Sequence, residues 1–110
     1  MKTTKILIVD DHEVVRDGLR NILTSLDNIS IAGEAGNGED AVKMYSSLKP
    51  DLVIMDISMP GMNGIEVTKL INEGFPEIKI LIQTVFNDSE KIFLAMCAGA
   101  SGYILKNDPP

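Results

Sequence analysis

Short apolar runs alternate along the chain with segments in which apolar residues recur every three or four positions. Runs such as Lys5–Val9 (KILIV) and Leu52–Met55 (LVIM) are typical of strands buried on both faces. The segment Glu13–Leu26 spaces its apolar residues with a helical period, which predicts an amphipathic helix. The predicted strands are Lys5–Val9, Ile29–Ala35, Leu52–Met55, Lys79–Gln83 and Gly102–Leu105. The predicted helices are Glu13–Leu26, Glu39–Leu48, Ile65–Asn72 and Ser89–Cys97.

The order of these elements favours a doubly wound α/β fold with a parallel five-stranded sheet. Each of the first four strands is followed by a helix, and such alternation produces parallel strands with helices on both faces. In sheets of this kind, ligands bind beyond the carboxyl ends of the strands. The polar residues at those ends are Asp10, Asp11, Asp56, Thr84 and Lys106. The sequence therefore predicts a site of three carboxylates, a hydroxyl and an ammonium at one edge of the sheet.

Composition narrows the class of protein. The 110 residues suit a single domain, and 10 basic against 16 acidic residues give a net charge of −6. This balance argues against binding nucleic acid or an anionic membrane through bulk charge. One cysteine, Cys97, excludes an internal disulfide and is typical of a reducing compartment; we expect it and the six methionines to fill the core. Because no apolar run suggests a membrane span or a signal peptide, we expect a cytoplasmic location.

The three clustered carboxylates predict a divalent cation. Crowded carboxylates repel one another, and hard oxygen ligands with room for water suit Mg²⁺. A softer metal is not expected, because His12 and Cys97, the single histidine and the single cysteine, lie far apart in the sequence. Mg²⁺ beside a lysine and a hydroxyl would accept a phosphoryl group, and an aspartate can form a covalent acyl phosphate. The sequence has no GxxxxGK[ST] phosphate loop.

These residues together resemble the receiver domain of bacterial response regulators in two-component signalling, over the whole chain. The matching segments are Ile6–Arg16 (ILIVDDHEVVR), Asp51–Gly64 (DLVIMDISMPGMNG), Thr84 and Ala98–Lys106 (AGASGYILK). The DDH start and the GASGYILK block are most similar to the LuxR/NarL-type transcription-factor branch, in which a receiver precedes a helix-turn-helix domain. The resemblance implies one receiver domain over residues 1–110, with a flavodoxin-like strand order of 2-1-3-4-5.

The resemblance also implies a phospho-acceptor and its metal ligands. Asp56 would accept the phosphoryl group. Mg²⁺ would be bound by the carboxylates of Asp11 and Asp56 and by the backbone carbonyl of Ser58, with Asp10 in support. The alternative to a metal-binding role is that Asp10 and Asp11 form a solvated helix cap. His12 is expected to be an exposed residue at the helix start rather than a ligand.

Further residues would read and tune the phosphoryl group. Lys106 and Thr84 would stabilise it, and Tyr103 would follow Thr84 inward as the second member of the switch. Ser58 and Phe86 occupy positions that tune phosphoryl lifetime in the family, and an apolar Phe86 does not position a hydrolytic water, so we expect a long lifetime.

The implied partners are a sensor histidine kinase as phosphodonor and a second copy of the chain upon phosphorylation. DNA would be bound only through a missing C-terminal domain, and no membrane partner is expected. The chain would be a switch that catalyses its own phosphorylation rather than a turnover enzyme. Alternatives are a stand-alone receiver or pseudo-receiver acting through protein binding, and an aspartyl-phosphate phosphatase of the haloacid-dehalogenase type. The phosphatase would place a second acid two residues after Asp10, where this sequence has His12.

Gln83, Val85 and the end of the chain depart from the family pattern, and Val85, where many members carry Ala or Gly, is expected to narrow access to the acyl phosphate. Gln83 stands where an apolar residue is usual, and its side chain is expected either to face a partner or to lie at an edge. The chain closes with Asn107-Asp108-Pro109-Pro110, in which Asp108 suits a helix N-cap and Pro109 the first helical position. We therefore expect that the fifth helix is absent, that the receiver is truncated at its C-terminus, and that the uncovered apolar surface favours self-association.

Overall fold

A computed structural model of the chain describes residues 3–57, 59, 61–75, 78–84, 97 and 99–105. Its strands are β1 (Thr4–Val9), β2 (Ile29–Ala35), β3 (Leu52–Asp56), β4 (Lys79–Thr84) and β5 (Gly102–Leu105). Its helices are α1 (Glu13–Thr24), α2 (Gly38–Leu48) and α3 (Gly64–Gly74). All strand pairs are parallel and the order is β2-β1-β3-β4-β5, which confirms the predicted sheet. Apart from Cys97, the predicted helix Ser89–Cys97 lies outside the described residues.

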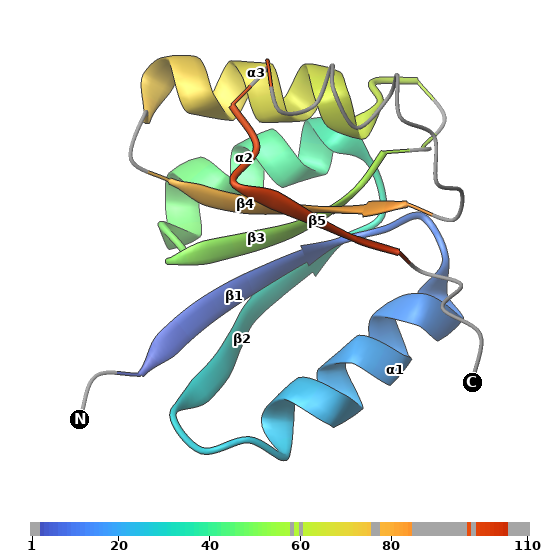
Figure 1. Ribbon diagram of the computed structural model, residues 1–110, viewed down its shortest axis with the longest axis vertical. Coiled ribbons are helices and arrows are strands. Elements are labelled where there is room, and N and C mark those ends of the chain that lie inside the picture. The colour runs from blue at the N-terminus through green and yellow to red at the C-terminus, as the bar shows by residue number, and fades with distance from the viewer. Residues whose placement is uncertain are drawn as a thin grey trace.

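The helices cover the sheet from both sides. In Figure 1, α1 lies against one face, and α2 and α3 lie together against the other. The chain leaves β1 toward β2 and returns past β1 to form β3, so the direction of strand addition reverses between β1 and β3. A reversal of this kind opens a crevice at the carboxyl ends of the two central strands, where doubly wound folds bind ligands.

The core explains why the central strands are apolar without interruption. Side chains alternate between the two faces of a strand, and both faces here are covered. The larger core cluster lies on the α2 and α3 side and includes Leu7, Val9 and Met55, all fully buried. A smaller cluster on the α1 side contains Ile6, Ile8 and Ile54.

Asparagine caps, rather than the apolar pattern, set the starts of α2 and α3. Asn37 accepts a hydrogen bond from the backbone of Asp40 at the start of α2, and Asn63 does the same for Glu66 at the start of α3. The end of α1 differs from the prediction because the chain turns at Ser25, and the side chain of Leu26 is half exposed. Among the described residues, no helix has the length and apolar character needed to cross a membrane.

The prediction that sulfur-containing residues fill the core is only partly confirmed. Met55 and Met59 are buried, as expected. Cys97 is exposed, so the prediction for this residue is wrong. A lone cysteine is compatible with either face of an amphipathic helix, and composition does not indicate which face it occupies.

Candidate functional site

Three acidic side chains meet at the carboxyl ends of β1 and β3. Asp10 directly follows β1 and Asp56 closes β3, and the pairing of Val9 with Met55 places the two acids on neighbouring strands. Asp11 begins the loop that leads into α1. One carboxylate oxygen from each acid and a ring nitrogen of His12 all lie within 4.8 Å of one another. The structure therefore brings together the acids that the strand ends predicted.

Burial makes this cluster suitable for a divalent cation. Asp10 and Asp56 are 0% and 1% exposed, whereas the side chain of Asp11 is 24% exposed. Like charges held together away from water are costly unless a counter-charge is present. The donors are hard carboxylate oxygens, and the partial exposure of Asp11 leaves access for the water ligands that Mg²⁺ retains. The acidic cluster fits the Mg²⁺-binding pocket of a receiver domain.

His12 is the N-cap residue of α1 and lies at the mouth of the cluster. Its side chain is 64% exposed, which confirms the expected exposure. Its backbone N–H donates to Asp10 Oδ1 at 2.9 Å, and its ring Nδ1 lies 3.2 Å from the same oxygen and 3.1 Å from Asp11 Oδ1. The alternative of Asp10 as a solvated helix cap is wrong, because Asp10 is buried and turns the chain ahead of the N-cap.

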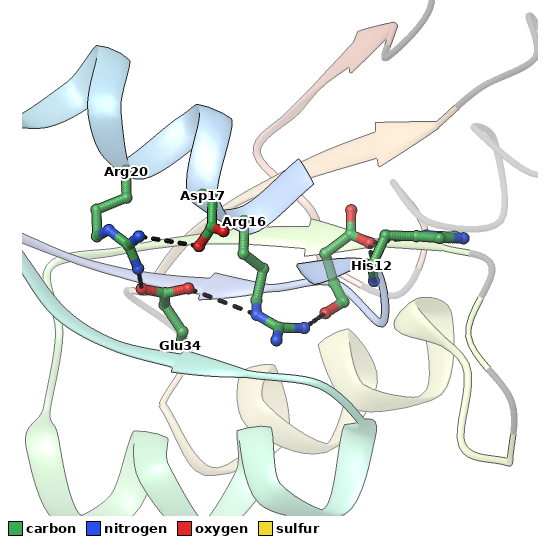
Figure 2. Close-up of polar contacts among 6 residues, drawn as sticks. His12, Arg16, Asp17, Arg20 and Glu34 are labelled. Atoms are coloured by element: carbon green, nitrogen blue, oxygen red, sulfur yellow. Dashed lines mark hydrogen bonds and ion pairs between the residues drawn. The ribbon is translucent and has the colours of Figure 1, made fainter. Parts of the chain in front are cut away.

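An ion-pair network, which sequence analysis missed, anchors the end of β1. Arg16 in α1 donates to the backbone carbonyl of Asp10 at 2.5 Å, and its Nε lies 3.5 Å from Glu34 of β2. Arg20 donates to Glu34 at 2.6 Å and to Asp17 at 2.9 Å (Figure 2). The hydrogen bond to Glu34 is the main reason that the pKa of Arg20 is raised. The available signal was two arginines four residues apart and a lone acid in the strand Ile29–Ala35.

The backbone after β3 is held closely against the start of α3. The N–H of Gly64 donates to the carbonyl of Ile57 at 3.0 Å. A β-carbon built on Gly64 would lie 2.1 Å from the carbonyl oxygen of Asp56, so a side chain at this position has no space. A glycine at the first position of α3 therefore allows the backbone carrying Asp56 to approach the helix.

For two of the remaining predicted site residues the structure gives the backbone position alone. The backbones of Thr84 and Tyr103 lie on adjacent strands, where Thr84 pairs with Leu105 and Tyr103 pairs with Ile82. Ser58, Val85, Phe86 and Lys106 lie outside the described residues, and their roles stay predictions.

Gln83 corrects one expectation. It is 5% exposed and pairs with Asp56 on one side and with Ile104 on the other, so it is neither an edge residue nor a partner-facing one. The interpretation was wrong because β4 is an interior strand of the sheet, paired at this position with a strand on each side.

Comparison with protein-family models identifies the family to which the chain belongs. The model of the response regulator receiver domain matches residues 6–110, and the chain belongs to this family. Its relatives include the uncharacterized transcriptional regulatory protein YhcZ of Bacillus subtilis, 44% identical over 106 residues, which are 96% of this chain and 50% of the relative. The response regulator VraR of Staphylococcus aureus is 41% identical over 104 residues, 94% of this chain and 50% of that protein.

Solved structures agree with this assignment. A LuxR-family response regulator from Aurantimonas sp. SI85-9A1 superposes with a TM-score of 0.93 at 37% identity, over 99% of this chain and 78% of that one. A LuxR-family DNA-binding response regulator from Staphylococcus aureus has a TM-score of 0.88 at 30% identity, over 96% and 88% of the two chains. The homologues are LuxR/NarL-type response regulators, which confirms the resemblance. The chain spans about half the length of the relatives YhcZ and VraR.

Proposed function

We propose that this receiver accepts a phosphoryl group from a sensor histidine kinase onto Asp56, with Mg²⁺ as cofactor, and so switches an output. The observation that carries the proposal is the acidic cluster at the crevice between β1 and β3. Asp56 is the acid that ends the central strand β3, and it is buried beside Asp10 and close to Asp11. Fully buried carboxylates at a ligand-binding position are a feature of function rather than of stability.

The chemistry needs little from the chain beyond positioning. A carboxylate oxygen of Asp56 attacks the phosphorus, the bond from phosphorus to the imidazole nitrogen of the donor breaks, and an aspartyl phosphate results. A carboxylate attacks as the deprotonated form of the acid, so this step requires no general base. Mg²⁺, when bound, supplies charge neutralisation for the carboxylates and the phosphoryl oxygens. Asp11, Asp56 and the backbone carbonyl of Ser58 would hold the cation, and Asp10 would support them.

Residues at the same edge of the sheet would respond to the charge of the phosphoryl group on Asp56. Phosphorylation replaces one carboxylate charge by roughly −1.5 to −2 and adds acceptor oxygens, as it does on hydroxyl residues. Lys106 and Thr84 would bind those oxygens, and Tyr103 on β5 would follow Thr84 on the adjacent β4. Such a rearrangement biases a two-state surface along β4 and β5. Ser58 and the apolar Phe86 would set the phosphoryl lifetime by limiting access of water.

The output is proposed from the relatives. YhcZ is named a transcriptional regulatory protein, and this chain covers half of it. We propose that residues 1–110 act as the receiver of a cytoplasmic transcription regulator that binds DNA through another domain. Phosphorylation would promote a homodimer and so bring two DNA-binding domains together.

Incubation with acetyl phosphate and Mg²⁺, followed by intact mass measurement, tests the phosphoryl transfer. The wild-type chain should gain the mass of one phosphoryl group and lose it in hydroxylamine, whereas Asp56→Asn should gain none and remain folded. Asp51→Asn is the matched control, because Asp51 directly precedes the first residue of β3, at the end remote from Asp56, and accepts a hydrogen bond from the backbone N–H of Lys5. Hydroxylamine-sensitive labelling of Asp56→Asn at the wild-type level would reject the assignment.

The same experiment separates the alternatives. A phosphatase of the haloacid-dehalogenase type would release inorganic phosphate continuously over many turnovers, and a pseudo-receiver would show no labelling of the wild-type chain. Either result would contradict the proposed switch.

A further inference from the structure

Gln83 has a buried polar group that the fold does not explain. The residue is 5% exposed, and its side-chain carbonyl oxygen Oε1 is fully buried. Among the residues that the structure describes, no donor lies within hydrogen-bonding distance of Oε1. Native proteins seldom bury an amide oxygen without a donor, and such a group calls for a specific reason.

The position of Gln83 in the sheet gives that reason. The register pairs Gln83 with Asp56, and the pairing of Val9 with Met55 places Asp10 on the other side of Asp56. Paired residues of neighbouring strands project to the same face, and neighbouring strands lie roughly 4.8 Å apart. Asp10, Asp56 and Gln83 therefore form a row across three strands at the carboxyl end of the sheet. All three are buried, and the register places Gln83 next to Asp56, at the border of the acidic cluster.

The chemistry of this row restricts what can pair with Oε1. Ionised carboxylates only accept hydrogen bonds, so neither acid can donate to the amide oxygen. A donor next to two carboxylates is favoured when it carries positive charge or is bound to a cation. Two donors of this kind enter a loaded phosphoryl site: a lysine ammonium and a water bound to Mg²⁺.

We propose that Gln83 is a positioning residue of the phosphoryl site, whose buried side-chain carbonyl accepts a hydrogen bond from the cationic donor that neutralises the loaded site. The inference rests on the proposed phosphorylation of Asp56. It assigns to Gln83 a role in setting the affinity of the site for the phosphoryl group. Without a donor, the buried Oε1 of Gln83 destabilises the free protein. It gains a hydrogen-bond donor when Mg²⁺ and the phosphoryl group occupy the site.

This role predicts opposite effects on stability and on loading. Gln83→Met keeps an unbranched side chain of similar length and removes the acceptor. The free protein should become more stable in urea unfolding, because the substitution removes a buried amide oxygen that has no donor. Binding of beryllofluoride in excess Mg²⁺, a stable mimic of the phosphoryl group, should weaken roughly tenfold or more, the value of a hydrogen bond to a charged donor. A residue with a purely structural role would not change the two properties in opposite directions.

Titration with Mg²⁺ alone identifies the donor. If the donor is a metal-bound water, Gln83→Met weakens binding of Mg²⁺ without beryllofluoride. If the donor is an ammonium, Mg²⁺ affinity is unchanged, and Gln83→Met has little further effect in a Lys106→Met background. Both results support the proposal, and each names a different source of the same hydrogen bond.

Thr68→Val is the matched control for removing a buried polar group. The hydroxyl of Thr68 is fully buried but donates to the carbonyl of Gly64 at 2.7 Å, so its removal should lower stability. The proposal is overturned if Gln83→Met binds beryllofluoride as tightly as the wild type, or if stability and affinity fall together. Failure of the wild-type chain to bind beryllofluoride or to be labelled would count against the proposed function instead.

Discussion

Gly64→Ala should displace the phospho-acceptor strand end without removing a functional group. Gly64 is buried at the first position of α3, and its N–H donates to the carbonyl of Ile57 at 3.0 Å. An added β-carbon would lie 2.1 Å from the carbonyl oxygen of Asp56, 2.8 Å from its carbonyl carbon and 2.9 Å from Cα of Ile57. All three atoms belong to the backbone, so no side-chain rotation can relieve the overlap.

The cost follows from this geometry. The nearest contact must lengthen by about 1.3 Å, from 2.1 Å to the 3.4 Å at which ordinary contact begins, so α3 and the end of β3 must separate. Overpacking of this kind typically costs ~1–3 kcal/mol, and the rigid partners place it at the upper end. Loss of the Gly64 to Ile57 hydrogen bond adds ~1 kcal/mol. We therefore expect the free energy of unfolding to fall by ~3–4 kcal/mol.

Urea unfolding and the rate of labelling by acetyl phosphate measure the two consequences. Gly18→Ala is the control, because a β-carbon on Gly18, within α1, has nothing within 4 Å. Replacement of this helical glycine by alanine should raise the free energy of unfolding by ~0.5–1 kcal/mol. The rate of labelling by acetyl phosphate should stay unchanged. If Gly64→Ala unfolds at the wild-type urea concentration and is labelled at the wild-type rate, the close approach of α3 to Asp56 does not exist in solution.

Three further predictions concern the surroundings of the site. Asp11→Ala should weaken Mg²⁺ binding roughly tenfold or more in a calorimetric titration, because it removes a charged ligand; unchanged affinity would mean that the ligand set is wrong. Arg16→Met should lower stability by ~1–2 kcal/mol and slow labelling, because the carbonyl of Asp10 and Glu34 both lose a charged donor; wild-type values for both would refute the anchoring role. Burial raises the pKa of Tyr45 above its usual 10.0, so the neutral phenol favours the fold, and stability present below pH 10.0 is lost as the pH rises through the folded-state pKa. Tyr45→Phe should reduce that alkaline loss in urea unfolding at several pH values, and an unchanged pH dependence would show that Tyr45 does not cause it.

The acids of the site could be predicted from the sequence because strand ends are easy to locate. Continuous apolar runs mark strands covered on both faces, and parallel strands bring their carboxyl ends to one edge. Asp10, Asp11 and Asp56 follow directly from these two rules, and the structure places them within 4.8 Å of one another. The positions of Thr84 and Tyr103 on adjacent strands follow from the same reasoning.

The contact of Glu34 with α1 could not be predicted, because it depends on an irregularity in strand pairing. Ile6 pairs with Ile31 but Leu7 pairs with Gly33, so β2 has one extra residue at this point. A slip of one residue moves every following side chain to the other face. Glu34 therefore pairs with Ile8 and reaches the arginines of α1, whereas simple alternation from Ile31 would point it away from them.

The burial of Gln83 was missed for a related reason. Strand periodicity assigns a residue to a face but does not show whether the neighbouring strands cover it. Gln83 is buried on a strand that pairs with both β3 and β5, and its row continues toward the acidic cluster. The role of a polar residue within an apolar run can thus be inferred only when the pairing of its strand with the neighbouring strands is known.

The two arginines of α1 hold the backbone beside the acidic cluster rather than pair with its carboxylates. The Arg16 guanidinium binds the backbone carbonyl of Asp10 and the carboxylate of Glu34, so this contact fixes the chain that carries Asp10 and Asp11 without pairing with their carboxylates. Arg20 is likewise directed to Glu34 and Asp17. A guanidinium placed on Asp10 or Asp11 would make the fold more stable but would compete with the cation for the same oxygens. Helix α1 thus holds the backbone of the site through Arg16, and a divalent cation that binds the folded state would add stability by mass action.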